Sequence, residues 1–106
     1  MQLQDLVQIV AESLNSGRPS VEEQLGLDIE TSDIYMKDKI DIDSELHFFD
    51  IEETEEYILY VKDGQEYTEL FMLWHAIELI EEYIKLEKLS IKDTALRLIE
   101  YRIKDA

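Results

Sequence analysis

Two strand-like segments joined by Asp63-Gly64 constrain the fold more than any other feature of the sequence. The segment before this pair, residues 57–62, is rich in aromatic and branched side chains. A two-residue Asp-Gly loop favours a β-hairpin because both of its positions must take positive φ. In that register Tyr60 faces Tyr67, and an aromatic cross-strand pair would stabilise the hairpin. The sequence therefore predicts an antiparallel sheet.

Helical periodicity appears before this hairpin. In residues 3–14, leucine and valine side chains fall on one stripe of a helix, which a turn at residues 15–17 ends. Ser20 and Glu23 have the spacing of a capping box. This spacing predicts a short second helix, closed by Gly26.

Two more helices are expected after the hairpin. A broad apolar arc in residues 70–84 predicts a long helix that begins after a cap at Thr68. Ser90 and Asp93 have capping spacing and predict a last helix. The short link at residues 87–89 makes these two helices antiparallel neighbours.

A second strand is expected before the hairpin. Residues 40–48 alternate between apolar and polar side chains, apart from Ser44, whereas residues 27–33 have no clear period. The expected fold is α+β. It has an N-terminal helix, a short second helix, an antiparallel sheet of about three strands and a C-terminal two-helix hairpin packed on the sheet. A chain of 106 residues fits one domain, spanning residues 1–106.

Negative charge is concentrated in one part of the chain. Residues 20–56 hold fourteen carboxylates and two lysines, and therefore about −12 of the net charge of −16. Charge this uneven repels itself, and folding must overcome that repulsion. The ten basic residues are scattered, so direct binding to nucleic acid or to an anionic membrane is not expected.

Other classes of function have little support in the residues. No serine lies in a G-x-S-x-G elbow, and the three glycines are isolated, so neither an enzyme nor a cofactor is expected. The chain has no cysteine, which favours a reducing compartment. The first residues lack a basic start, and charges interrupt the apolar-rich residues 70–89, so we expect no secretory signal and no membrane span. The expected location is the cytoplasm.

A calcium loop is the one metal site that the spacing suggests. Acidic or imidazole side chains stand at positions 1, 3, 5, 7 and 12 of such a loop: Asp41, Asp43, Glu45, His47 and Glu52. Leu46, however, stands at position 6, where the motif needs glycine for its sharp turn. A solvated strand face is the preferred interpretation, and a metal-binding domain is a remote alternative.

The acidic segment provides the candidate partner-binding residues. Side chains two apart in a strand lie on one face about 6.7 Å from each other, so Asp41, Asp43 and Glu45 are expected to form a regular anionic row. Phe49 and Ile51 lie on the strand face opposite Phe48, and if that face is not covered they are expected to form an apolar patch ringed by acids. The complete candidate set is Asp41, Asp43, Glu45, Phe49, Asp50, Ile51, Glu52, Glu53, Glu55 and Glu56.

These residues suggest a non-enzymatic acidic protein-binding module. In charge and size alone, the chain resembles small inhibitors and immunity proteins that block nucleases. By mimicking nucleic acid, the row would dock on the basic surface of a nuclease or another nucleic-acid-handling protein. The alternative is an adaptor or structural subunit, either monomeric or homodimeric, whose acidity is only solvation. The sequence leaves the oligomeric state open.

Overall fold

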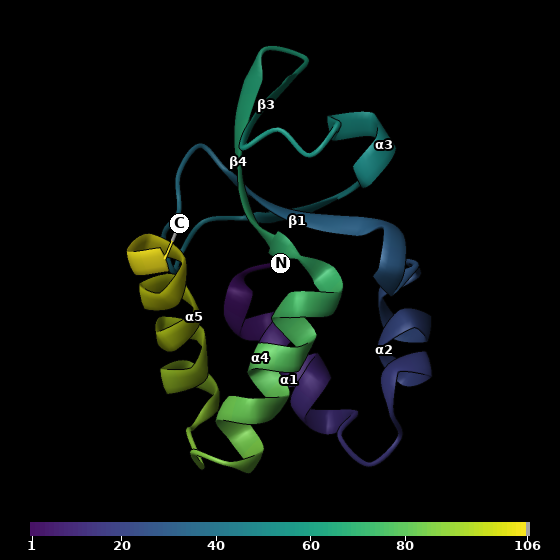
Figure 1. The fold of residues 1–106 in the computed structure, drawn as a ribbon, viewed down its shortest axis with the longest axis vertical. Coiled ribbons are helices and arrows are strands. Elements are labelled where there is room, and N and C mark those ends of the chain that lie inside the picture. Colours follow the sequence, from purple (N-terminus) through teal and green to yellow (C-terminus); the bar gives the residue numbers. More distant parts are fainter. Residues whose placement is uncertain (106) are drawn as a thin grey trace.

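The computed structural model describes residues 1–105, apart from the side chains of Arg18 and Asp105. These residues form five α-helices and a four-stranded antiparallel sheet (Figure 1). In chain order the elements are α1 (Leu3–Glu12), α2 (Arg18–Leu25), the 3-10 helix η1 (Ile29–Thr31), β1 (Ser32–Lys37), β2 (Leu46–Asp50), α3 (Ile51–Thr54), β3 (Leu59–Lys62), β4 (Gln65–Met72), α4 (Leu73–Lys85) and α5 (Ile91–Asp105). The strand order is β2-β1-β4-β3. The α+β fold expected from the sequence is confirmed, with four strands where about three were predicted.

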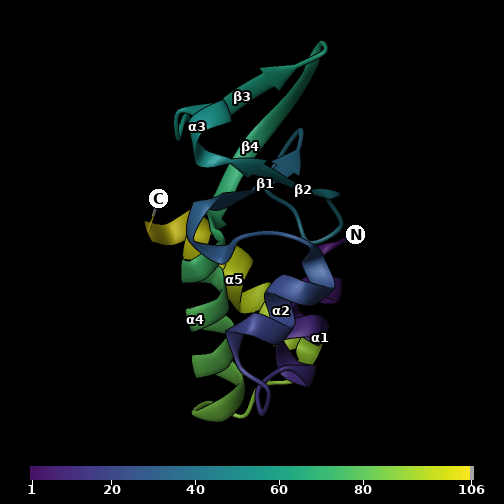
Figure 2. The ribbon, with the colours of Figure 1, turned by 90° about the vertical axis from the view of Figure 1, so that its right-hand side faces the viewer.

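The main core lies between one face of the sheet and the larger helices (Figure 2). Ile34 and Met36 point from β1 into this core and are fully buried. Leu6 of α1, Ile80 of α4 and Leu98 of α5 meet them there, also fully buried. Helix α4 contacts β1 and β4 directly, whereas α5 packs mainly on α1 and α4. The predicted C-terminal helical hairpin therefore covers the sheet mainly through its first helix.

The central strand β1 is the element that periodicity did not reveal. Every residue from Ser32 to Met36 is buried, because both faces of β1 are covered. A strand covered on both faces has no alternation of apolar and polar residues. The alternating pattern that reveals a half-buried strand is therefore absent from β1.

The predicted strand at residues 40–48 is wrong in its first part. β2 begins at Leu46, and residues 40–45 lie outside any strand, with a turn at residues 42–43. The Oδ1 atom of Asp41 accepts a hydrogen bond from the Asp43 amide at 2.9 Å, and the Ser44 hydroxyl donates to the carbonyl of Lys39 at 2.8 Å. Short polar side chains that bond to nearby backbone groups compete with strand formation. Here the local bonds prevail over the alternating pattern.

The start of the long helix was also predicted wrongly. Thr68 was expected to cap it, but β4 continues to Met72 and α4 begins at Leu73. Phe71 pairs with Ile34 of β1 in the antiparallel ladder. An apolar pair such as Leu70-Phe71 fits either a strand or a helix, so the choice depends on the partner strand.

The hairpin at Asp63-Gly64 is confirmed. Tyr60 pairs with Tyr67, and the loop residues have φ of 53° and 79°. The β3–β4 hairpin projects beyond the helices, at the top of Figure 1. Two predicted helix ends are also confirmed, because Gly26 closes α2 with φ of 68° and the Ser90 hydroxyl accepts from the Asp93 amide at 3.1 Å.

Candidate functional site

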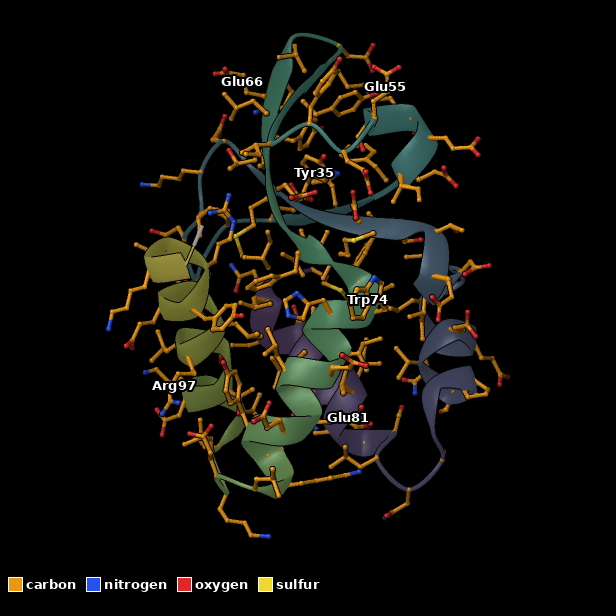
Figure 3. The ribbon with its side chains drawn as sticks, viewed as in Figure 1. Tyr35, Glu55, Glu66, Trp74, Glu81 and Arg97 are labelled. Atoms are coloured by element: carbon orange, nitrogen blue, oxygen red, sulfur yellow. The ribbon has the colours of Figure 1, made fainter. Side chains whose placement is uncertain are left out.

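The face of the sheet opposite the main core carries an aromatic cluster. Neighbouring rings have centroids 4.8 to 6.2 Å apart, and the members are Tyr35, His47, Phe49, Tyr60 and Tyr67. The Nζ atom of Lys62 lies 5.4 Å from the centre of the Phe49 ring. In Figure 3, Tyr35 lies between β1 and the projecting hairpin. Through Tyr60 this cluster joins β3 to β1 and β2.

Five acids surround the short helix α3, and we call them the α3 acidic turn: Asp50, Glu52, Glu53, Glu55 and Glu56. Asp50 caps the helix, since its Oδ1 atom accepts a hydrogen bond from the Glu52 amide at 2.8 Å. Glu55 and Glu56 then reverse the chain with φ of 54° and 61°, a region that non-glycine residues rarely adopt. The reversal brings the chain directly into β3, and Figure 3 shows Glu55 at this end of the molecule.

Glu53 connects the α3 acidic turn to β3. Its Oε2 atom accepts hydrogen bonds from Lys62 Nζ at 2.9 Å and from the Tyr60 hydroxyl at 2.8 Å. These two donors lower the pKa of the Glu53 carboxyl group below its ordinary value. Among the described residues, Glu53 is the only member of the α3 acidic turn in an ion pair. The other carboxylates of the turn are exposed to solvent.

Beside these acids lies a run of exposed apolar side chains, which we call the β3 apolar edge. The exposed fractions are 60% for Tyr57, 61% for Ile58, 62% for Leu59 and 59% for Val61. β3 is an edge strand, so one side of its backbone also faces solvent. Contiguous exposed apolar side chains on a folded domain commonly mark an interaction site.

The predicted anionic row at Asp41, Asp43 and Glu45 does not exist. These residues lie in the turns before β2, where the strand spacing of about 6.7 Å does not apply. Asp41 serves the turn as an acceptor, and Glu45 lies 3.5 Å from the His47 ring. The structure therefore separates this group from the α3 acidic turn instead of aligning the two.

The predicted apolar patch is also wrong for Phe49. Its side chain is buried in the aromatic cluster, with 9% exposed. Ile51 is half-buried at the start of α3. The apolar side chains near α3 that reach solvent follow the turn instead: Tyr57, Ile58, Leu59 and Val61.

A buried and a half-buried carboxyl group form a pair next to this region, on the same sheet face as the aromatic cluster. Asp33 of β1 is fully buried, and neither of its oxygens has a hydrogen-bond donor among the described residues. Glu69 of β4 is its neighbour, and each of the two carboxyl groups affects the pKa of the other. Burial, together with the Asp33 charge, raises the pKa of Glu69 from 4.5 to about 7, although Arg102 opposes the shift. Burial likewise raises the pKa of Asp33.

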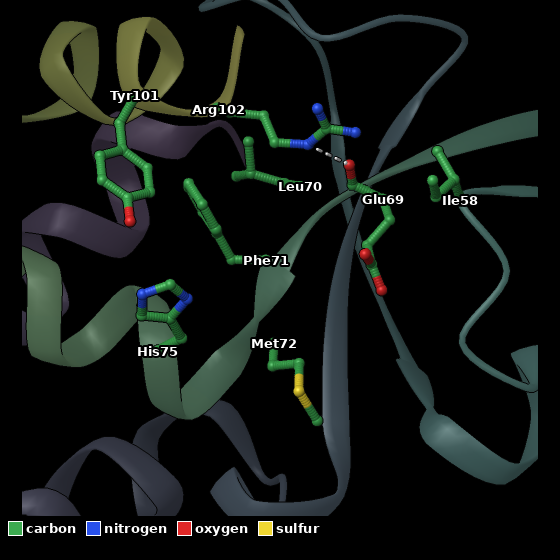
Figure 4. Close-up of a pocket in the computed structure, with 8 residues that line it drawn as sticks. All are labelled: Ile58, Glu69, Leu70, Phe71, Met72, His75, Tyr101 and Arg102. Atoms are coloured by element: carbon green, nitrogen blue, oxygen red, sulfur yellow. Dashed lines mark hydrogen bonds between the residues drawn. The ribbon is translucent and has the colours of Figure 1, made fainter. Parts of the chain in front are cut away.

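A cavity of about 350 Å³ opens where β4 meets the C-terminal helices (Figure 4). Its lining residues are Ile58, Glu69, Leu70, Phe71, Met72, His75, Tyr101 and Arg102. Arg102 Nε donates to the main-chain carbonyl of Glu69 at 3.1 Å, while the Glu69 carboxylate points away from the guanidinium group (Figure 4). The cavity is mostly apolar, and it shares Ile58 with the β3 apolar edge.

Sequence reasoning missed two parts of this region. Ile58, Leu59 and Val61 were recognised as strand residues but not as a surface, because a β pattern does not say what covers a strand. Asp33 and Glu69 were missed because they lie far apart in the chain. The available signal was Asp33 itself, a single acid directly before the apolar run Ile34-Tyr35-Met36.

Residues 1–105 contain no group of three or more acidic or imidazole side chains placed to hold a metal ion. None of the described helices has the length and apolar character needed to cross a bilayer. Comparison with protein-family models, with curated proteins and with solved structures found no match to this chain.

Proposed function

We propose that this protein is a non-enzymatic protein-binding module that docks on a basic surface of another protein. The docking surface consists of the β3 apolar edge and the α3 acidic turn. One observation carries the proposal: four neighbouring apolar side chains, each about 60% exposed, lie on or just before a projecting edge strand, and five acids directly precede them in the chain. Interfaces with an apolar centre and a charged rim have this composition.

The apolar edge accounts for part of the binding energy. Complete burial of a branched or aromatic side chain contributes about 1.5–3 kcal/mol, so burying the exposed parts of these four contributes roughly 5 kcal/mol. Association itself costs about 4–15 kcal/mol in lost freedom of motion. Apolar burial alone therefore gives weak binding, and the partner must also engage charges or backbone groups.

The α3 acidic turn supports a basic partner. Two charges 10 Å apart in water interact by about 0.4 kcal/mol before salt screening, so each pair contributes little. A chain with net charge −16 nevertheless speeds its encounter with a cationic surface. Nucleases and other nucleic-acid-handling proteins have such surfaces, and we propose this class of partner. The chain's lack of cysteine supports the further proposal that the protein works in the cytoplasm.

A second candidate function is that of an adaptor or a homodimeric subunit. It is favoured by three other exposed apolar side chains in the C-terminal part of the chain: Leu86, Leu96 and Ile103. They are 75%, 41% and 64% exposed. In this case the acidity serves solubility, and the C-terminal helices make the contacts.

Affinity capture from lysate, with the captured proteins identified by mass spectrometry, distinguishes these functions. We expect the unmodified chain to retain basic proteins at low salt and to lose them at high salt. Glu52→Gln with Glu55→Gln, or Leu59→Ser with Val61→Ser, should remove the same proteins. The matched charge control is Glu23→Gln with Glu82→Gln, two exposed acids outside the surface, which should retain them.

The opposite pattern favours the second function. Leu86→Ser with Ile103→Ser would then abolish capture or dimerisation, while the variants at Glu52, Glu55, Leu59 and Val61 would behave as the unmodified chain does. If the control variant at Glu23 and Glu82 loses the basic proteins as completely as the surface variants do, general charge attraction explains the binding. That result would refute the proposed surface.

A further inference from the structure

We propose that the partner docks by adding a strand to the free edge of β3, and that this strand alternates apolar and basic side chains. The inference rests on the proposed function and adds the form of the partner segment. It follows from the backbone of β3, from the two faces of the hairpin and from the charge around them.

The register of the hairpin determines which backbone groups of β3 are free. Glu69 donates its amide to the carbonyl of Ile58 at 2.8 Å, so Ile58 directs its carbonyl toward β4. Backbone groups alternate in direction along a strand, so Tyr60 and Lys62 also face β4. Leu59 and Val61 then direct their amide and carbonyl groups outward, where an incoming strand can bond to them.

The other edge of the sheet is less available. The outward amide of Leu46, at the start of β2, donates to the carbonyl of Met1 at 2.8 Å. That contact occupies the start of the β2 edge with the N-terminus of the chain. Among the described residues β3 has no comparable backbone contact, and Leu59 and Val61 are 62% and 59% exposed.

The two faces of the hairpin specify the side chains of the incoming strand. Leu59 and Val61 lie on one face, and Tyr60 and Lys62 lie on the other together with Glu53. Cross-strand neighbours on the same face interact directly. Residues of the partner that lie beside Leu59 and Val61 must therefore be apolar. On the other face Lys62 is already paired with Glu53, so the exposed carboxylates of the α3 acidic turn favour basic side chains there.

The same geometry disfavours a second copy of this chain as the occupant. Antiparallel pairing of two β3 edges brings the same face of both sheets together, so the two α3 acidic turns would lie side by side. Each copy carries a net charge of −16, and like charges brought together oppose association. A cationic strand satisfies the same backbone groups and is attracted by the acids.

The test uses the full chain and a synthetic eight-residue peptide of alternating valine and lysine. The readout is amide hydrogen exchange of the unmodified chain, with and without the peptide. We expect at least tenfold slower exchange at Leu59 and Val61, whose amides are free in the unbound chain. Tyr60 and Lys62, already bonded to β4, should change little. A peptide of the same composition with four valines followed by four lysines should bind at least tenfold more weakly.

A proline variant tests the backbone contact independently. Val61→Pro removes an outward amide without removing a bond to β4, because proline is tolerated at such an edge position. We expect at least tenfold weaker binding of the alternating peptide. Val61→Thr keeps the amide and the branched shape, and its affinity should stay within threefold of that of the unmodified chain.

The outcomes separate this inference from the function on which it rests. If basic proteins are captured through the α3–β3 surface but exchange at Leu59 and Val61 does not slow, docking occurs without strand addition and the inference is wrong. If the two peptides bind equally, charge alone explains binding and the inference again fails. Protection that appears without peptide and rises with protein concentration would identify self-pairing and overturn it. Loss of all capture would refute the proposed function itself.

Discussion

At the scale of single residues, the acids of this chain have three different roles. The identity of the side chain, aspartate or glutamate, does not reveal which role a residue has. Asp41 and Asp50 accept local backbone hydrogen bonds, Glu53 pairs with Lys62, and Asp33 is buried opposite Glu69. A carboxylate that already makes such a contact has less hydrogen-bonding capacity left for a partner. The sequence could therefore predict the amount of negative charge near the site but not which carboxylates present it.

The carboxyl pair makes stability depend on pH in a defined direction. The pKa of Glu69 is about 7 in the folded chain and near 4.5 in its ordinary state, so the folded chain binds more protons between these values. The contribution of Glu69 to the stability of the fold is therefore greatest below about pH 4.5 and falls as pH rises toward 7. We expect the free energy of unfolding of the Glu69→Gln variant to fall by about 1–2 kcal/mol less than that of the unmodified chain as pH rises. The figure is small because Glu69 is partly exposed to solvent.

Urea unfolding at pH 5, 6, 7 and 8 measures this effect. The control is Glu66→Gln, which changes an exposed acid three residues earlier on the same strand and should keep the pH dependence. An unmodified chain whose free energy of unfolding is constant over this range would contradict the raised pKa of Glu69.

At the scale of elements, the β3–β4 hairpin determines whether the proposed surface exists. Its loop needs left-handed backbone at both positions, which Asp63 and Gly64 adopt. That requirement is local, so the sequence predicted the hairpin and its register correctly. By contrast, the boundary between β4 and α4 depends on pairing with β1, and the sequence placed it several residues too early.

Gly64 can be tested for its contribution to the hairpin. A Cβ atom at this position would meet no heavy atom within 4 Å, so the cost of Gly64→Ala is purely conformational. We expect a loss of about 1 kcal/mol in the free energy of unfolding, and a smaller loss for Gly64→Asn because asparagine tolerates the left-handed region better. Urea denaturation measures both. Equal losses would argue against the assigned backbone conformation.

At the scale of the whole molecule, uneven charge opposes folding while it favours a cationic partner. The α3 acidic turn lies at one end of the molecule, with its carboxylates in solvent, and the described basic side chains neutralise only part of the charge. Salt weakens repulsion between exposed charges more than it weakens the packing of the core. The fold and the proposed docking should therefore respond to salt in opposite directions.

Thermal unfolding tests this opposition. Raising NaCl from 20 to 500 mM should increase the Tm by roughly 4–8 °C, which corresponds to about 1 kcal/mol for a domain of this size. Glu52→Lys with Glu55→Lys should reduce this increase, because two of the repelling charges have changed sign. A Tm that falls with salt would show that attractive surface pairs, and not repulsion, dominate the electrostatics.

The sequence alone determined the features that depend on neighbouring residues. These are the four longer helices, the positive-φ loop of the hairpin, the antiparallel α+β fold and the concentration of acids. Tertiary structure alone decided that Ser32–Lys37 is the central strand, that Phe49 is buried and that the edge from Tyr57 to Val61 is exposed. The physical reason is that strand pairing and burial depend on segments far apart in the chain, whereas caps and turns are determined by a few adjacent residues.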